Sequence, residues 1–244
     1  MMCGAKPSRR MRRPWWNGSG RPSRGLCARC ASRHDGCRAG LSALDILPTG
    51  RQKQDMAHGT TREQLMAAAE RLVRTRGYSA ISYADLAEAV GIRKASIHHH
   101  FPAKADLGAA LAIDYTTRFG TLLEAIDNDV SHALARIERY AGIYESSVQD
   151  GMLCLCGMLV TEMQTLPEDV RIGVRRFFAH QLAWLTRVLA EGAARGELRL
   201  VGKPETAAER ILSALEGATL VAWGMSDPGV VARATADLIA TLKI

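Results

Sequence analysis

Residues 81–107 constrain the fold more than any other stretch of this chain, because they encode two short helices joined by a glycine turn. Ser82 is placed to cap the first helix, and Asp85 follows three residues later as its capping-box partner. Gly91 then supplies the permissive backbone that a tight turn between helices requires. We therefore expect a helix-turn-helix unit here.

The second helix of this unit is expected to present a polar, basic face to the outside. Ile97 and Phe101 are four residues apart and face the core together. Pro102 ends the helix because it disfavours helical geometry at Phe101. The positions turned outward are Lys94, Ala95, Ser96, His98 and His99. A face of this chemistry suits the major groove of DNA.

Lys104 falls in the first turn of the next helix, which begins near Ala103. A cation at a helix N-terminus opposes the helix dipole unless a negative group lies in front of both. A DNA phosphate would satisfy both, and a solvated lysine is the alternative. Because Lys104 follows a helix-turn-helix unit, we expect a phosphate contact and not a solvated lysine.

The same stretch resembles the DNA-binding domain of the TetR/AcrR family of bacterial transcriptional regulators. The landmarks that carry the resemblance, between Thr60 and about Leu111, are Gly77-Tyr78, Ala87-Glu88-Ala89-Val90-Gly91-Ile92 and Phe101-Pro102-x-Lys104. Two positions depart from the family: Arg93 replaces the usual Ser or Thr, and His98 replaces the usual Tyr. Both are compatible with DNA binding but leave the operator sequence open. The resemblance implies an all-α protein, in which an N-terminal three-helix DNA-binding domain precedes a larger helical domain for ligand binding and dimerisation.

Ten residues are expected at the DNA interface on this basis. Phosphate contacts are expected from Lys94, His98 and Lys104, with Thr61 and Tyr83 at neighbouring helix starts. Base contacts are expected from Arg93, Ala95, Ser96 and His99, and Ser82 completes the set.

The positive charge of the chain is concentrated near its start. Residues 1–58 carry 12 of the 32 Lys and Arg residues but only 3 of the 25 acidic ones, whereas residues 59–244 have a net charge of −2. The total of +7 is therefore weak evidence for DNA binding, and the placement of basic groups within the helix-turn-helix carries the argument.

Residues 1–58 form a basic leader rich in Arg, Gly, Ser and Pro, which we expect to be disordered. Its Cys27-x-x-Cys30 motif with His34 and Cys37 admits a zinc site, although the later gaps are tight for tetrahedral ligation. The alternative is an over-long gene start, because Met56 reads like an ordinary beginning for the family.

We expect a DNA-binding domain over 59–107 and a helical effector and dimerisation domain over 108–244.

Helical periodicity dominates the rest of the chain, with no credible alternating strand series. We expect helices at 61–76 and, beyond the helix-turn-helix, near 103–128, 130–149, 151–165, 167–192, 204–224 and 228–242. The apolar segment from Met152 to Met163 should run through the middle of the second domain.

An effector site is expected among these helices, because the resembling regulators bind small ligands there and such pockets are mostly apolar. The expected effector-binding or sensing residues are Cys154, Met158, Phe177, Phe178 and Trp184. The alternative for each is ordinary core packing.

Cys154 is the strongest candidate sensor in the second domain. Its place near a helix start favours a lowered thiol pKa, and the surrounding segment loosely resembles that of N-ethylmaleimide-responsive repressors. Cys156 points about 200° away on a helix, which excludes an easy disulfide between the two. A buried structural thiol is the alternative.

The last two helices carry small residues at close spacing, among them Ala214 and Gly217, and predict a homodimer with a four-helix interface. The partners expected are a near-palindromic double-stranded DNA operator and a small-molecule effector.

Several other classes have little support. We expect no cofactor and no metal at His98-His99-His100, because adjacent helical positions diverge by 100°. No catalytic motif points to an enzyme. No secretory signal or membrane span of ~18 apolar residues is present, which favours a cytoplasmic protein. Two alternatives to a ligand-responsive repressor stay open: a thiol-based redox protein and a sequence-tolerant DNA-organising protein.

Overall fold

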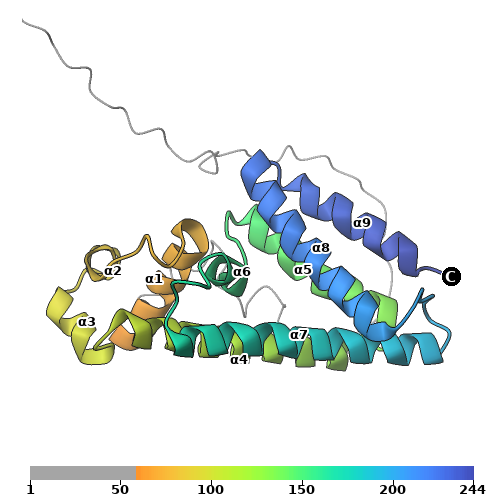
Figure 1. The fold of residues 1–244 in the computed structure, drawn as a ribbon, viewed down its shortest axis with the longest axis horizontal. Helices are drawn as coiled ribbons and strands as arrows, with labels where there is room; N and C mark the ends of the chain where they lie inside the picture. Colours follow the sequence, from red (N-terminus) through yellow and green to blue (C-terminus); the bar gives the residue numbers. More distant parts are fainter. Residues whose placement is uncertain (1–58) are drawn as a thin grey trace, which may run out of the picture. The chain divides into compact units, whose positions relative to one another are not determined.

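A computed structural model describes residues 59–244, and every regular element in that range is a helix (Figure 1). The helices are α1 (Thr61–Arg76), α2 (Tyr83–Val90), α3 (Lys94–His100), α4 (Lys104–Asp129), α5 (Ala133–Gln149), α6 (Leu155–Val160), α7 (Glu168–Ala194), α8 (Pro204–Met225) and α9 (Gly229–Leu242). The prediction of an all-α chain is confirmed. The basic leader and its cysteines lie outside the described residues.

Local capping explains where the first helices begin. The Thr60 hydroxyl accepts from the Glu63 backbone N–H, and the Glu63 carboxylate accepts from the Thr60 N–H at 2.8 Å. Ser82 and Asp85 form the same reciprocal box at the start of α2. Gly91 ends α2 in the left-handed region with a φ of 77°, which an L side chain rarely adopts. The helix-turn-helix expected from the sequence is therefore present.

The long helices α4 and α7 run side by side and build the centre of the helical body (Figure 1). Their backbones approach closely at Gly173, where an added Cβ would lie 2.6 Å from the Ala112 Cβ. Helix α4 also passes without a break through the expected domain boundary between residues 107 and 108. It therefore connects the helix-turn-helix directly to the larger core.

The segment around α6 is buried as expected, but it is much less helical than expected. The sequence predicted a helix over 151–165, whereas α6 covers only Leu155–Val160. Gly151 has a φ of 70°, and the Leu153 backbone bonds to Arg74 through both its N–H and its carbonyl. These bonds to another helix replace helical ones, so the prediction of a long helix was wrong.

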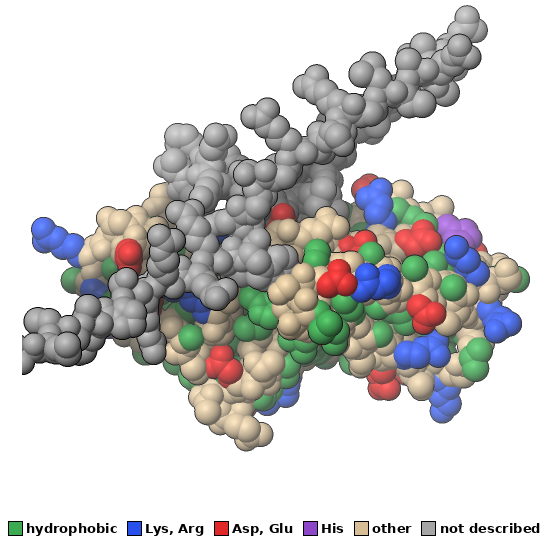
Figure 2. Space-filling view, turned by 90° about the horizontal axis from the view of Figure 1, so that it is seen from above, with side chains coloured by type: hydrophobic (Ala, Val, Ile, Leu, Met, Phe, Trp, Pro, Cys, Tyr) green, Lys and Arg blue, Asp and Glu red, His purple; other side chains and the backbone are tan. Residues whose placement is uncertain are grey.

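Helices α5, α8 and α9 pack on one another, and α5 and α8 also pack on α7. The outer side of α8 carries exposed apolar side chains at Leu220, Val221 and Met225. On the face shown in Figure 2, Lys and Arg alternate with Asp and Glu, consistent with the near-neutral charge of residues 59–244. None of the described helices has the length and apolar character needed to cross a membrane.

Candidate nucleic-acid interface and effector pocket

Helix α3 presents the outward face that the sequence predicted. Ile97 is fully buried and Phe101 nearly so, which fixes the rotation of the helix on the core. The exposed side chains are Lys94, Ala95, Ser96, His98 and His99. Arg93 is exposed just before them and makes no side-chain capping bond, so its guanidinium is not used to hold the helix start. The face thus combines cationic groups with small side chains that permit close approach.

Three expected DNA contacts have their polar groups engaged within the protein. The Tyr83 side chain is buried and its hydroxyl donates to the Phe101 carbonyl at 2.8 Å. The Ser82 hydroxyl donates to the Asp85 carboxylate at 2.6 Å. The Lys104 ammonium donates to the Ile81 carbonyl at 2.7 Å. Two of these side chains tie the parts of the helix-turn-helix together, and Ser82 caps α2.

Lys104 has a second internal contact, because its ammonium lies 4.6 Å from the centre of the Tyr78 ring. Burial lowers its pKa despite the opposing charges of Glu162 and Asp85. The sequence predicted that Lys104 would contact a DNA phosphate. In the structure its ammonium group instead contacts Ile81 and Tyr78 in the loop between α1 and α2. Thr61 lies in the first turn of α1, half-buried, beside the capping residue Thr60.

A carboxylate that follows α6 in the chain holds this same loop. Glu162 accepts hydrogen bonds from the backbone N–H groups of Tyr78 at 2.7 Å and Ser79 at 2.8 Å. Sequence reasoning missed this contact because 84 and 83 residues separate the partners. A single glutamate after an apolar segment does not indicate from the sequence that it accepts hydrogen bonds from a loop far away in the chain.

Arg74 makes a corresponding contact at the other end of the α6 segment. Its side chain is buried, donates to the Leu153 carbonyl at 2.7 Å, and pairs with Glu70 at 3.1 Å. The second guanidinium nitrogen reaches the Ser147 hydroxyl on α5. A buried, fully bonded arginine therefore fixes α1 to the body of the protein.

The larger of two cavities among the described helices is an open pocket between α6, α7 and α8 with a volume of about 270 Å³. Most of its wall is apolar, and its polar groups are two carboxylates and one hydroxyl. Its lining residues are Gly157, Val160, Phe178, Leu182, Glu209, Leu212, Ser213, Glu216 and Leu220. Phe178 lines it as expected, whereas Glu216 was missed by the sequence reading. A smaller cavity, lined in part by Cys154 and Tyr144, has about 10 Å³, room for a single water at most.

The other expected effector residues lie away from the larger cavity. Phe177 is buried between the rings of Tyr115 and Phe119, each 5.3 Å away between centroids. The Met158 methyl lies 3.9 Å from where a Cβ on Gly77 would stand. Both side chains therefore pack within the protein, Met158 against the end of α1.

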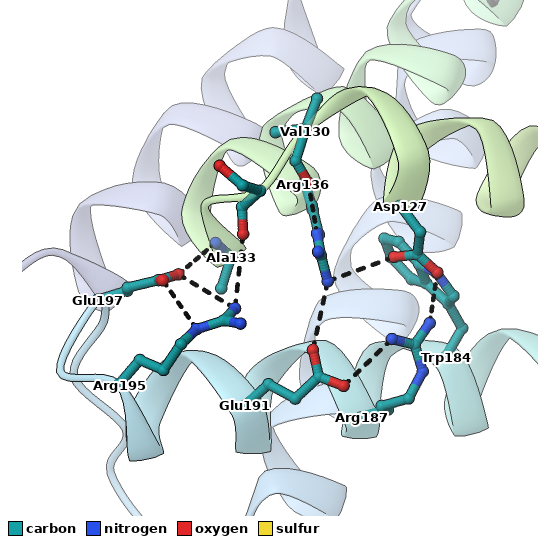
Figure 3. Close-up of polar contacts among 10 residues, drawn as sticks. Asp127, Val130, Ala133, Arg136, Trp184, Arg187, Glu191, Arg195 and Glu197 are labelled. Carbon is teal, nitrogen blue, oxygen red and sulfur yellow. Dashed lines mark hydrogen bonds and ion pairs between the residues drawn. The ribbon is translucent and has the colours of Figure 1, made fainter.

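Trp184 belongs to a polar network at the far end of the α4–α7 pair (Figure 3). Its indole N–H donates to the Asp127 carboxylate at 3.1 Å, and its ring stacks on Tyr140 at 5.4 Å. Arg136 joins this network by reaching Asp127 at 3.5 Å and Glu191 at 3.3 Å. The indole is thus held as a structural group that joins the end of α4 to α7.

Cys154 caps α6 and is buried, with its sulfur accepting from the Gly157 N–H at 3.4 Å. Burial raises the pKa of this thiol well above its ordinary value, and the neighbouring Glu216 and Cys156 act in the same direction. The expected lowering of the pKa by a helix start was wrong, because desolvation outweighs the single N–H donated to the sulfur. Cys156 is also fully buried.

Glu216 lies between the Cys154 thiol and the larger cavity. The Tyr144 hydroxyl donates to its carboxylate at 3.3 Å, and Cys154 bonds to it as well. Burial raises the pKa of Glu216 to about 7, although both hydrogen bonds oppose that shift. One residue in the lining of the cavity therefore carries a carboxyl group with a pKa near neutral pH.

Comparison with known proteins places this architecture in a family. Residues 65–111 match the family model for bacterial regulatory proteins of the tetR family, and residues 130–238 match the tetracyclin repressor-like C-terminal domain. The transcriptional regulator AcuR of Cereibacter sphaeroides is 34% identical over 180 residues, which cover 71% of this chain and 79% of AcuR. The chain belongs to the TetR family of transcriptional regulators.

Other members of the TetR family agree with this assignment. The repressor NemR of Escherichia coli strain K12 is 28% identical over 169 residues, covering 66% of this chain and 83% of NemR. A crystal structure of a TetR-family transcriptional regulator from Agrobacterium tumefaciens is 33% identical, with a TM-score of 0.73. It covers 75% of this chain and 97% of its own. The likeness therefore extends from the helix-turn-helix through the helical body.

Proposed function

We propose that this TetR-family regulator is a repressor that binds a near-palindromic operator as a homodimer and is released by a small effector. The observation that carries the proposal is the exposed face of α3, fixed by the burial of Ile97 and Phe101. The repressor names among its relatives, such as NemR, support the direction of control.

The DNA contacts we propose divide by chemistry. Lys94 and His98 contact phosphates, while Arg93, Ser96 and His99 are placed to meet base edges. Ala95 permits close approach, and Thr61 contacts phosphate from the start of α1. Tyr83, Ser82 and Lys104 act by holding the helix-turn-helix in shape, with the Lys104 charge adding to the local positive potential.

The dimer we propose uses α8 and α9. Leu220 and Val221 are exposed on α8, and a Cβ added at Gly217 would meet no atom within 4 Å. Such an open, partly apolar helix face suits close packing against a second copy. Twofold pairing would set the two α3 helices about one DNA turn apart, roughly 34–36 Å.

Release follows from movement of the α6 segment. This segment borders the larger cavity at Gly157 and Val160, and it is bonded to the DNA-binding domain through Leu153 and Glu162. An effector that shifts α6 therefore shifts the loop between α1 and α2. Coupling of about 1–3 kcal/mol is enough for a switch of 5- to 150-fold.

Modification of Cys154 is a second possible mode of release. Burial and the raised pKa of Cys154 disfavour the reactive thiolate, so we propose a reversibly bound effector as the main signal. If quinones or hypochlorite release the protein from DNA and Cys154→Ser abolishes that release, modification is the signal instead.

Selection of bound fragments from a whole genome with the purified full-length protein tests the proposed function. We expect enrichment of one near-palindromic sequence, and competition by random duplex only at large excess. Equal affinity for operator and random duplex would contradict the proposal and favour a sequence-tolerant DNA-organising role.

A further inference from the structure

The cavity between α6, α7 and α8 combines apolar walls with negative charge. Phe178, Leu182 and Leu212 supply hydrophobic surface, whereas the ionisable groups in its lining are Glu209 and Glu216. Among the described residues that line it, none is basic. An anionic ligand would therefore meet repulsion without a compensating cation.

Glu216 is the group that makes this asymmetry costly. Glu216 is one of the residues that line the cavity, and the hydrogen-bond partners of its carboxylate, Tyr144 and Cys154, are neutral groups. The titratable groups that face Glu216 from the neighbouring elements are two tyrosines on α5 and two cysteines at α6: Tyr140, Tyr144, Cys154 and Cys156. Helix α7 contributes the apolar side chains of Phe178 and Leu182 to the same cavity. An ionised carboxylate in such surroundings lacks a counter-charge, which is unfavourable for a partly buried group.

We propose that this cavity binds a small lipophilic amine, whose protonated nitrogen pairs with Glu216 and whose apolar body lies against Phe178, Leu182 and Leu212. The inference deepens the proposed function, on which it rests, by naming the chemical class of the effector. The amine supplies the missing positive charge, and a charge-assisted hydrogen bond in a partly buried site is stronger than a neutral one. The cavity volume of about 270 Å³ is sufficient for a compact molecule.

The position of Glu216 also connects the ligand to α6. A Cβ on Gly157 would lie 2.5 Å from the Glu216 Oε2 atom, so the carboxylate rests directly against the α6 backbone. An amine that draws the carboxylate into the cavity removes this contact. Loss of this contact would change the position of α6, which hydrogen bonds at Leu153 and Glu162 connect to the DNA-binding domain.

Titration calorimetry of the full-length protein with three probes of similar shape tests the proposal. The probes are 2-phenylethylamine, 2-phenylethanol and phenylacetate, which differ in charge at one end. We expect the amine to bind at least about tenfold more tightly than the alcohol, which corresponds to one charge-assisted hydrogen bond. We expect phenylacetate to bind most weakly. Equal binding of amine and alcohol, absence of amine binding, or preference for phenylacetate would overturn the proposal.

Proton release supplies a second readout that ordinary hydrophobic binding does not give. Pairing with an amine stabilises the charged form of Glu216, so binding at pH 7 should release a fraction of a proton, measured in buffers of different ionisation enthalpy. Glu216→Gln keeps the shape of the side chain and should remove both the proton release and the preference for the amine. Retention of both in this variant would overturn the assignment.

Two further variants locate the site within the cavity. Glu209→Gln is the matched control, because Glu209 is exposed at the rim, and the amine preference should change by less than about threefold, the scale of an exposed ion pair. Gly157→Ala forces the Glu216 carboxylate away from the α6 backbone, as amine binding does, and should therefore leave the amine preference in place. If Glu209→Gln abolishes amine binding and Glu216→Gln does not, the proposal fails. DNA binding by the same samples is measured separately, so loss of the pocket proposal and loss of the proposed function are distinguishable.

Discussion

The Glu162 carboxylate accepts a hydrogen bond from the Tyr78 backbone N–H at 2.7 Å, which joins the end of the α6 segment to the loop between α1 and α2. At the beginning of that segment, Arg74 donates to the Leu153 carbonyl, also at 2.7 Å. Residues 153–162 are therefore tied to the DNA-binding domain at both ends. A displacement of α6 can therefore be transmitted to the helix-turn-helix through these hydrogen bonds.

Glu162→Ala should loosen this connection. It leaves the Tyr78 and Ser79 backbone N–H groups without their acceptor. The cost of about 1–3 kcal/mol for a buried donor is an upper limit here, because the Tyr78 bond is part-buried and Ser79 is exposed to water. We expect faster hydrogen exchange at Tyr78 and Ser79, measured by mass spectrometry, with little change in α8 and α9. Glu124→Ala on the exposed side of α4 is the control and should leave exchange at both positions unaltered. Unchanged exchange in Glu162→Ala would show that the bonds do not hold the loop.

Lys94→Ala and Lys104→Ala should behave differently, although the sequence suggested the same role for both. Lys94 is exposed, so its loss should reduce the log–log slope of DNA affinity against salt by about 0.9, the share of one phosphate. Lys104 donates to the Ile81 carbonyl, so its loss should lower the free energy of unfolding as well. Fluorescence anisotropy over a salt series and denaturant titration separate the two effects. Equal stability of the two variants would contradict the structural role of Lys104.

Gly217→Glu should disrupt the proposed dimer without harming the protomer. A side chain at this position meets no atom within 4 Å of its Cβ, and replacing Gly within a helix favours helix formation. A charge in the packed centre of a four-helix interface is unfavourable. Sedimentation velocity should show monomers, whereas Gly142→Glu, equally open but on α5, should stay dimeric. A dimeric Gly217→Glu protein would move the interface elsewhere.

Glu216 should make stability depend on pH. Its pKa is about 7 in the folded protein against an ordinary 4.5, so folding favours its protonated form. Its contribution is fully present below pH 4.5 and is lost as pH rises through about 7, amounting to at most about 3 kcal/mol. Urea unfolding between pH 5 and pH 8, at one protein concentration, should show a steeper fall for the natural protein than for Glu216→Gln. Parallel curves would contradict the raised pKa.

The features predictable from sequence are those with local causes. The capping box of Ser82 and Asp85, the turn at Gly91 and the inward pair Ile97 and Phe101 all act within a few residues, and the structure has each of them. The predicted start and end of the first helix, 61–76, also agree with α1.

The features that sequence reasoning missed depend on distant partners. The helix predicted over 151–165 is cut short by the bonds between Leu153 and Arg74, 79 residues apart. The Cys154 thiol has a raised pKa because tertiary burial outweighs its place at a helix start. Glu216 was absent from the expected site because a glutamate on an amphipathic helix is normally predicted to lie at the surface. Its burial depends on contacts with α5 and α6, which the sequence does not reveal.

Operator affinity of the full-length protein, measured by fluorescence anisotropy over a series of salt concentrations, tests the account most directly. We predict tight binding to the selected palindrome, a steep loss with salt, and weakening by Arg93→Ala that is greater on the operator than on random duplex. Salt-independent binding, or no binding to any duplex by a folded dimer, would contradict the account.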